Sequence, residues 1–250
     1  MSTENFLVEI GTEELPPKAL LTLSNAFSKA ILAGVKDSKL SFGEAKSYAT
    51  PRRLALFIAD LQVQGEDQAV EVFGPPADRA RDDEGNWTPA AQGFARKNGV
   101  NPEELEIAET EKGARLAYRS TSAGIRAADI LPELVADSLH KLPIPKRMRW
   151  GAGRTEFVRP VHWILALLGS DVLDCTILGR QSGRLTRGHR FHSSGEIEIR
   201  AAQDYSAALA AAHVVADFSQ RRDIIRGQVI EQAKKVNCTA VISDDLLDEV

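Results

Sequence analysis

The chain has 250 residues, of which 43% are hydrophobic and 26% are charged, and its net charge is −4, as expected for a globular protein with one large or two small cores. No apolar run approaches the roughly 20 residues that span a bilayer. The opening MSTENFLVEIG lacks the basic start and long apolar run of a signal peptide. Cys175 and Cys238 form no CxxC pair, so we expect no disulfide framework and a reducing, cytoplasmic setting.

The N-terminal part of the chain predicts a strand, a helix and two further strands. Residues 6–10 (FLVEI) are typical of a strand, and a helix is expected to begin near Pro16 and Pro17, because the first-turn N–H groups of a helix need no intrahelical partner. Apolar residues then recur every three or four positions, at Leu20, Leu23, Phe27, Ile31 and Val35. The two strands are expected at 45–50 and 53–63.

Residues 74–122 are predicted to form a small inserted α/β subdomain, and residues 1–73 and 123–250 the main body. The turn-forming FGPP at 73–76 marks its start. Thr88 and Pro89 are a good N-cap and first helical residue, and two short strands follow at 106–109 and 115–120. A helix over 127–141 then returns the chain to the main body.

The remainder of the chain predicts a sheet-rich segment followed by helices. Strands are expected at 161–168, 172–178, 187–191 and 196–200, and helices at 204–211 and 218–236, the last one amphipathic with a basic outer face. The final DDLLDEV resembles the start of a helix with no stop signal, which suggests a truncated chain. The expected fold class is α+β, with mixed sheets and packed helices.

Positive charge is concentrated in residues 142–192. This segment holds nine Lys/Arg and three acids, a charge of +6, whereas the rest of the chain carries −10. Trp150, Trp163 and Phe191 lie among these basic residues. A basic segment with interspersed aromatic rings is typical of a surface that binds a polyanion such as RNA, although solvated surface arginines are the plainer alternative.

The candidate nucleic-acid contacts are basic residues next to prolines, glycines or aromatic rings. Two adjacent arginines after Pro51 point to opposite sides of an extended chain, so one can contact phosphate while the other pairs internally. In 146–150, alternation places Lys146, Met148 and Trp150 on one face, where the alternative is a core position for the last two. The full set is Arg52, Arg53, Lys146, Arg147, Arg149, Arg159, Arg187 and Arg190.

Signatures of catalysis are weak. The chain has no GxxxxGK[ST] phosphate loop, GxGxxG, HExxH or GxSxG word, so we expect no catalytic residue and no bound metal. His189 and His192 would point to opposite faces of a strand, which disfavours a metal-dependent hydrolase built on them and Glu196. Glu9, Glu13 and Glu14 are explained by turn and helix-dipole roles, with pairing of Glu13 or Glu14 to a basic residue of the Arg52–Arg53 turn as the alternative.

Five words of the sequence carry a family resemblance. They are FLVEIGTEELPPK at 6–18, TPRRLA at 50–55, LPIPK at 142–146 with MRWG at 148–151, RPVHW at 159–163, and RGHRF at 187–191. In this order they resemble the beta subunit of the bacterial heterotetrameric glycyl-tRNA synthetase. The match runs from Phe6 to Val250, and the family's beta subunit is much longer, so the chain resembles its N-terminal part.

The resemblance implies a function as well as a family. A glycine–tRNA ligase joins glycine to tRNA(Gly) with ATP and magnesium, and in this family the separate alpha subunit carries that chemistry. We therefore expect this chain to bind no cofactor, to contribute to tRNA binding, and to assemble with the alpha subunit as two alpha and two beta subunits. An assembly module that docks the alpha subunit without touching tRNA is the alternative.

Overall fold

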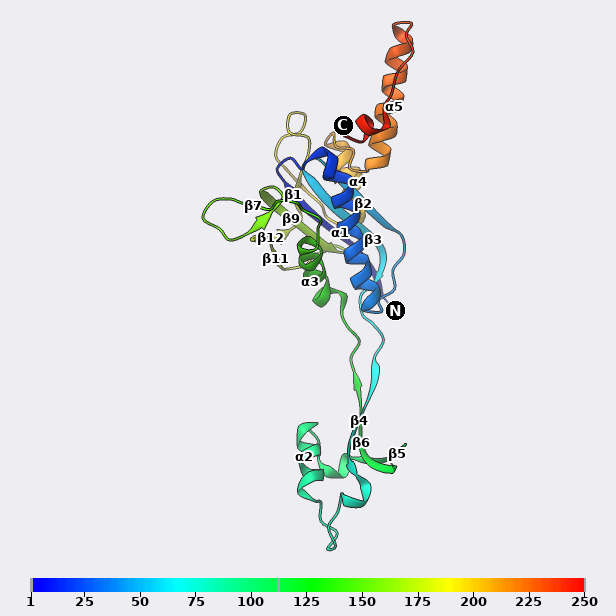
Figure 1. Ribbon diagram of the computed structural model, residues 1–250, viewed down its shortest axis with the longest axis vertical. Coiled ribbons are helices and arrows are strands. Elements are labelled where there is room, and N and C mark those ends of the chain that lie inside the picture. Colours follow the sequence, from blue (N-terminus) through cyan, green and yellow to red (C-terminus); the bar gives the residue numbers. More distant parts are fainter. Residues whose placement is uncertain (1, 112, 250) are drawn as a thin grey trace. The chain divides into compact units, whose positions relative to one another are not determined.

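The computed structural model describes residues 2–111 and 113–249, and it divides into two compact units. The first unit comprises Met1–Gln64 and Ile125–Val250, and the second comprises Gly65–Gly124 (Figure 1). The first unit has two hydrophobic cores and the second unit has one. The mixture of helices and sheets confirms the predicted α+β class.

The first unit is built on a mixed sheet in which β1 (Thr3–Thr12) is central. β1 pairs antiparallel with β3 (Arg53–Gln62) on one side and with β9 (Val161–Leu168) on the other. The sheet order is β11–β12–β9–β1–β3–β2, and its other strands are β2 (Ala45–Thr50), β10 (Asp171–Val172), β11 (Thr176–Ile177) and β12 (Arg180–Gly183). Residues Phe6 to Ile10 are completely buried because both neighbouring strands and both faces cover them.

Alternation along β1 separates two cores. Phe6, Val8 and Ile10 belong to the larger core, which helices α1 (Pro17–Asp37) and α3 (Ala127–His140) cover. The apolar positions predicted for α1, from Leu20 to Val35, are all buried in that core, and Pro17 opens the helix as expected. Leu7 faces the second core on the other side of the sheet. Glu9 lies two residues after Leu7 in the same strand, so its side chain points to the same face of the sheet. Its carboxyl group therefore lies among the residues of the second core.

The second core is covered by short elements that come after the strands of this sheet in the sequence. They are β13 (Leu185–Arg187), β14 (Glu196–Glu198), η3 (Ala202–Asp204) and α4 (Tyr205–Ala211). Tyr205 and Leu209 are fully buried against Leu7 and Leu165 of the sheet. β13 and β14 form an antiparallel pair, and residues 188–195 connect them. We call residues 188–195 the connecting loop.

The structure corrects three of the predicted elements. A strand was predicted at 187–191, but β13 covers Leu185–Arg187, and residues 188–191 belong to the connecting loop. The strand predicted at 172–178 is interrupted between β10 and β11. Helix α5 (Phe218–Lys235) has the predicted span, but none of its residues is buried, so it is not the amphipathic core helix that its apolar residues indicated.

The remaining elements of the first unit are small. β7 (Met148–Arg149) pairs with β8 (Glu156–Phe157). α6 (Asp244–Glu249) lies against α5 through ion pairs of Arg222 with Asp244 and Asp248. Within residues 2–111 and 113–249, no helix is long and apolar enough to cross a membrane.

The second unit is a three-stranded sheet packed against one helix. The strand order is β4 (Gln68–Pro76), β6 (Gly113–Ser122) and β5 (Glu106–Thr110), with α2 (Pro89–Lys97) and two single turns, η1 (Ala77–Arg79) and η2 (Pro102–Glu104). As expected, Thr88 caps α2. The sequence placed this insertion at 74–122; the compact unit begins earlier, at Gly65, because β4 pairs with β6 from Gln68 onward.

Candidate nucleic-acid interface

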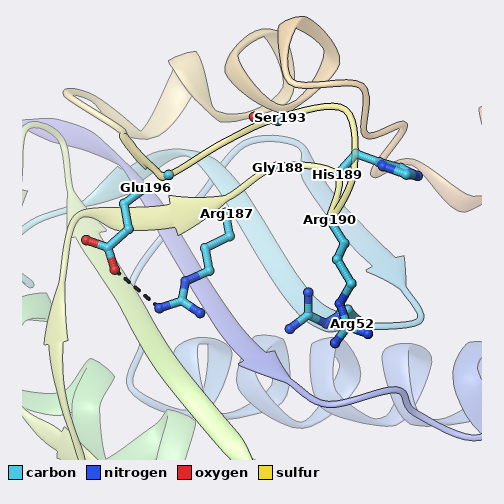
Figure 2. A pocket seen from close by; sticks show the side chains of 8 residues that line it. Arg52, Arg187, Gly188, His189, Arg190, Ser193 and Glu196 are labelled. Carbon is cyan, nitrogen blue, oxygen red and sulfur yellow. Dashed lines mark hydrogen bonds and ion pairs between the residues drawn. The ribbon is translucent and has the colours of Figure 1, made fainter.

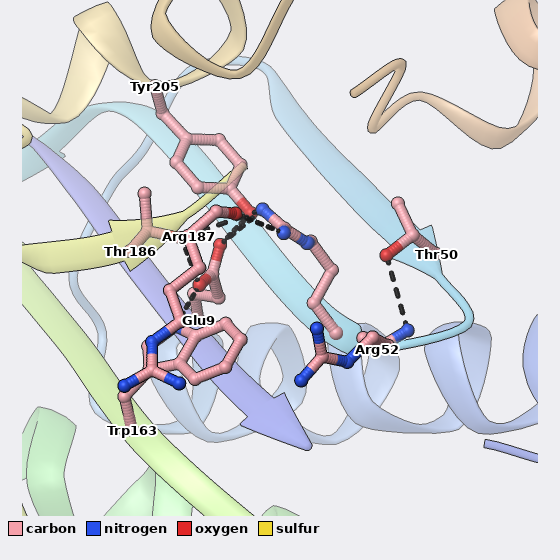
Figure 3. Close-up of polar contacts among 8 residues, drawn as sticks. Glu9, Thr50, Arg52, Trp163, Thr186, Arg187 and Tyr205 are labelled. Atoms are coloured by element: carbon pink, nitrogen blue, oxygen red, sulfur yellow. Dashed lines mark hydrogen bonds and ion pairs between the residues drawn. The ribbon is translucent and has the colours of Figure 1, made fainter. Parts of the chain in front are cut away.

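A buried polar network begins at Glu9 in the middle of β1. The Glu9 side chain is 0% exposed and its carboxyl group accepts hydrogen bonds from Thr186 Oγ1 (2.6 Å), from the Tyr205 hydroxyl and from Trp163 Nε1 (Figure 3). Arg53 Nη1 lies 3.3 Å from Glu9 Oε2. A buried charge is tolerated only when it is paired and hydrogen-bonded, and these donors meet that requirement.

The local sequence explains how the network fits between the strands. Gly11 of β1 is paired with Trp163 of β9, and a Cβ atom at Gly11 would lie 1.9 Å from the indole ring. Glycine therefore lets the Trp163 ring lie across β1 and reach Glu9. Burial, followed by the Glu9 carboxyl group, raises the pKa of Tyr205 well above its usual range, which keeps its hydroxyl group protonated as a donor.

Arg53 connects this network to the connecting loop. Its Nη2 donates a 2.6 Å hydrogen bond to the carbonyl oxygen of Arg187, the last residue of β13. Burial is the largest single influence and acts to lower the pKa of Arg53, but Glu9 and Tyr205 together outweigh it, so the pKa lies above its usual value. Arg53 is thus an internal partner, one of the two roles left open by the sequence, and it fixes the backbone from which the loop departs.

Three arginines meet beside this loop. Arg52, Arg187 and Arg190 line a cavity of about 340 Å³, together with Gly188, His189, Ser193, Gly195 and Glu196. Figure 2 shows Arg190 extending from the loop toward Arg52, which comes from the β2–β3 turn. Partial burial, then the nearby Arg190, lowers the pKa of Arg52. Its Nε atom is buried without a hydrogen-bond partner. This cavity, here called the arginine cavity, has the concentrated positive charge that attracts a phosphate.

Glu13 supplies a counter-charge to these arginines. Its carboxylate lies 3.9 Å from Arg52 Nη2, 3.3 Å from Arg190 Nη2 and 3.0 Å from His162 Nε2. Although burial acts to raise it, the pKa of Glu13 is lowered by Arg52, by the His162 hydrogen bond and by Arg190. The sequence favoured a turn or helix-dipole role for Glu13 and kept pairing with the arginine turn as the alternative; the structure shows that pairing, with Arg52. Arg187 has its own acid, Glu196, at 3.4 Å, and its guanidinium group lies 5.4 Å from the centre of the Trp163 ring.

A second cavity adjoins the arginine cavity and has a different character. Its volume is about 330 Å³, and it shares Arg52, Gly188, His189 and Arg190 with the first. Its other lining includes Pro51, Phe191, His213, Val214 and Val215. We call it the ring cavity, because the aromatic rings of Phe191 and His213 belong to its lining. Phe191 is 84% exposed.

The other predicted arginines lie at separate places. Arg159 Nε donates to the carbonyl oxygen of Glu14 at 2.9 Å, and Arg159 lines a cavity of about 710 Å³ with Arg190. Arg147 Nη2 donates to the carbonyl oxygens of Leu139 and His140 at the end of α3. Lys146 is exposed, and Arg149 pairs with Glu156 across β7 and β8. The structure therefore brings together Arg52, Arg187 and Arg190 at the arginine cavity, and Arg159 shares a separate cavity with Arg190.

The histidines lie differently from the sequence expectation. Because 188–193 turns instead of extending as a strand, the rings of His189 and His192 lie 4.5 Å apart on the same side. His192 is exposed, and the His213 ring is 5.8 Å from it. Among the described residues, no group of three His, Cys, Asp or Glu side chains is arranged to hold a metal ion.

Sequence reasoning missed several residues that build this face. Tyr205 and Thr186, which anchor Glu9, and His213, which lines the ring cavity, were not singled out. A usable signal existed for Glu9 alone: a charged residue in the otherwise apolar word FLVEI requires a buried partner. Its partners come from 44 to 196 positions away in the sequence.

Comparison with known proteins identifies the family. Residues 6–250 match the family model described as glycyl-tRNA synthetase beta subunit. The chain is 48% identical over its whole length to a protein of Marinobacter nauticus and 49% identical to one of Hahella chejuensis, each named "Glycine--tRNA ligase beta subunit". A Pseudomonas fluorescens protein of the same name is 48% identical. The chain covers 36% of the length of each of these relatives. With the match spanning nearly every residue, the chain belongs to the glycyl-tRNA synthetase beta subunit family.

Proposed function

We propose that this chain is the N-terminal part of a glycine–tRNA ligase beta subunit and that it helps to hold tRNA(Gly). The named relatives support the ligase assignment. In this proposal the chain supplies no bond-making group. ATP, magnesium and glycine are handled by a separate alpha subunit, within a cytoplasmic assembly of two alpha and two beta subunits.

The observation that carries the proposal is the arginine cavity. Arg52, Arg187 and Arg190 converge on it in a chain whose net charge is −4, and the acids paired with them are Glu13 and Glu196. Guanidinium groups match the geometry of phosphate oxygens, and each phosphate contact releases condensed counterions from RNA. Binding energy of this kind positions a tRNA without taking part in the chemical step.

The experiment is a titration of tRNA(Gly) with the chain and its variants at several salt concentrations. Arg187→Ala and Arg190→Ala are the test variants, because both side chains are about half exposed and neither is part of a core. Arg96→Ala is the matched control, since it removes the same charge from an exposed position in α2 of the second unit. Each test variant is expected to weaken binding and to flatten the plot of log affinity against log salt by about 0.7 to 0.9.

The alternative, an assembly module that docks the alpha subunit, predicts another pattern. Arg187→Ala and Arg190→Ala would then leave tRNA affinity equal to that of Arg96→Ala and would lower the affinity for the alpha subunit. Lys146 and Arg149 are suited to such docking because they lie exposed on and beside the β7–β8 pair. Measuring both affinities on the same variants separates the two functions.

A further inference from the structure

We propose that the arginine cavity and the ring cavity together form a site for one unpaired nucleotide of an RNA strand. In this site a phosphate binds Arg52, Arg187 and Arg190, and the attached base stacks against Phe191 beside His213. The inference rests on the proposed function, which is that this face binds tRNA. It adds that the part of the RNA bound here is an unpaired nucleotide.

The two cavities have the chemistry of the two ends of a nucleotide. The arginine cavity offers three guanidinium groups to a phosphate. The ring cavity offers Pro51, Val214 and Val215 as apolar walls and the Phe191 and His213 rings as stacking partners. They share Arg52 and Arg190, so one ligand can occupy both. Each volume, about 340 Å³ and 330 Å³, falls in the range of small-ligand sites.

Phe191 is the feature that neither stability nor folding explains. Its ring is 84% exposed at the tip of the connecting loop, where it contributes little to a core. An exposed aromatic ring next to clustered arginines is what a single-stranded RNA platform presents, because every base has a π face and every nucleotide has a phosphate.

The loop that carries Phe191 is held in place. The Nδ1 atom of His189 accepts hydrogen bonds from the backbone amides of Phe191 (3.2 Å) and His192 (3.3 Å). The amide of His189 donates to the carbonyl oxygen of Ala212 at 3.0 Å. A Cβ atom at Gly188 would lie 2.7 Å from the Ala212 side chain, so glycine permits this close approach. A loop backbone held in advance loses little conformational entropy when a base stacks on the ring that the loop carries.

The ligand must be unpaired because the base has to leave its helix to reach the ring cavity. In a duplex the bases are stacked on one another and only phosphates and base edges face the protein. A duplex could therefore occupy the arginine cavity but not both cavities. Single-stranded ends and loops of tRNA provide nucleotides whose base and phosphate are free together.

The test compares an unstructured single-stranded oligoribonucleotide with a blunt-ended RNA hairpin of equal phosphate number, each titrated by fluorescence anisotropy. A non-nucleotide linker replaces the hairpin loop, so that the hairpin presents no unpaired base. The variants are Phe191→Ala, Phe191→Trp and Phe73→Ala. Phe73 is 46% exposed in β4 of the second unit, so its replacement is a matched control. We expect the single strand to bind about tenfold more tightly than the hairpin. Phe191→Ala should remove about that factor for the single strand alone, and Phe191→Trp and Phe73→Ala should retain it.

Failure of this inference is distinguishable from failure of the proposed function. If the hairpin binds as tightly as the single strand and Phe191→Ala changes neither, the nucleotide site is overturned, even where Arg187→Ala and Arg190→Ala still weaken RNA binding. If those arginine variants match Arg96→Ala, the proposed RNA face itself is wrong. A nucleoside monophosphate that binds as tightly as the oligoribonucleotide would make this a small-molecule site and would overturn the assignment to RNA.

Discussion

Glu13 differs from the other acids near the arginine cavity because it pairs with two of the three arginines that line the cavity. Its carboxylate is close to Arg52, Arg190 and His162 at once, and its side chain is 38% exposed. Such partly exposed pairs contribute little to stability. A carboxylate in this position neutralises the arginines in the absence of ligand and competes with any incoming anion.

Replacing Glu13 by Gln is therefore expected to strengthen RNA binding. The change keeps the size of the side chain but removes the charge that competes with phosphate, so affinity for tRNA(Gly) at low salt should rise about two- to fivefold. Glu106→Gln is the matched control, because Glu106 is also an exposed acid paired with an arginine, Arg119, in the second unit. Fluorescence anisotropy at low salt measures both variants.

An unchanged or lower affinity for Glu13→Gln would contradict this role. An equal increase for Glu106→Gln would attribute the effect to net charge alone. A gain confined to Glu13→Gln would place phosphate binding at Arg52 and Arg190.

The sequence could indicate which residues are chemically significant but not which way each one faces. Alternation predicted that Arg52 and Arg53 point to opposite sides, and they do: one lines the arginine cavity and the other reaches Glu9. The choice between them depends on Glu9 and on the Arg187 carbonyl, which is 134 positions from Arg53. Contacts of such long range leave no local pattern in a sequence.

At the scale of elements, β1 depends on one glycine to accommodate Trp163. Gly11→Ala would place a methyl group 1.9 Å from the indole ring, which must then move away from Glu9. We expect the free energy of unfolding to fall by about 3 kcal/mol, from the overpacking and from the lost hydrogen bond.

The control for Gly11→Ala is another glycine of the same unit. Gly227 lies within α5, and a Cβ atom there meets nothing within 4 Å. Gly227→Ala should raise the free energy of unfolding by about 0.5 to 1 kcal/mol, because alanine loses less backbone entropy in a helix. Urea unfolding followed by circular dichroism compares the two. Equal stability of Gly11→Ala and the parent chain would mean that the ring does not need this space.

Elements with a strong internal period were predictable, and those fixed by distant contacts were not. α1, α3 and β9 were predicted within a residue or two, because their apolar residues repeat with the period of a helix or form one buried run. The connecting loop was mistaken for a strand, since its turn is made by the His189 side chain and by Ala212 of a later helix end. In α5 the apolar residues suggested a buried face, yet none of them is buried.

At the scale of the whole molecule, the candidate basic residues follow the division of the chain into two units. Both cavities and all eight candidate basic residues belong to the first unit. The second unit has its own core around Ala91, Ala95 and Leu116 and its own sheet. Net charge computed for the whole chain therefore conceals a basic face within the first unit.

This division predicts that the first unit folds and binds RNA without the second. The two points at which the chain leaves and re-enters the first unit lie side by side in space. Gln64 and Arg126 form an antiparallel bridge there, and the Ala127 amide donates to the carbonyl oxygen of Val63 at 2.9 Å. Replacing residues 65–124 with Asn-Gly leaves three residues, Asn, Gly and Ile125, between Gln64 and Arg126, which is a common length for a hairpin loop. The two cores of the first unit lose none of their buried residues.

The shortened chain is expected to unfold in a single cooperative transition and to bind tRNA(Gly) with the salt dependence of the parent chain, because its phosphate contacts are unchanged. Arg190→Ala made in the shortened chain provides the control and should weaken binding by the same factor as in the parent. Loss of cooperative unfolding would mean that the first unit needs the second for its stability. A folded shortened chain with a flatter salt dependence would instead assign part of the RNA surface to residues 65–124, where the basic residues of α2, Arg96 and Lys97, would be the first to replace.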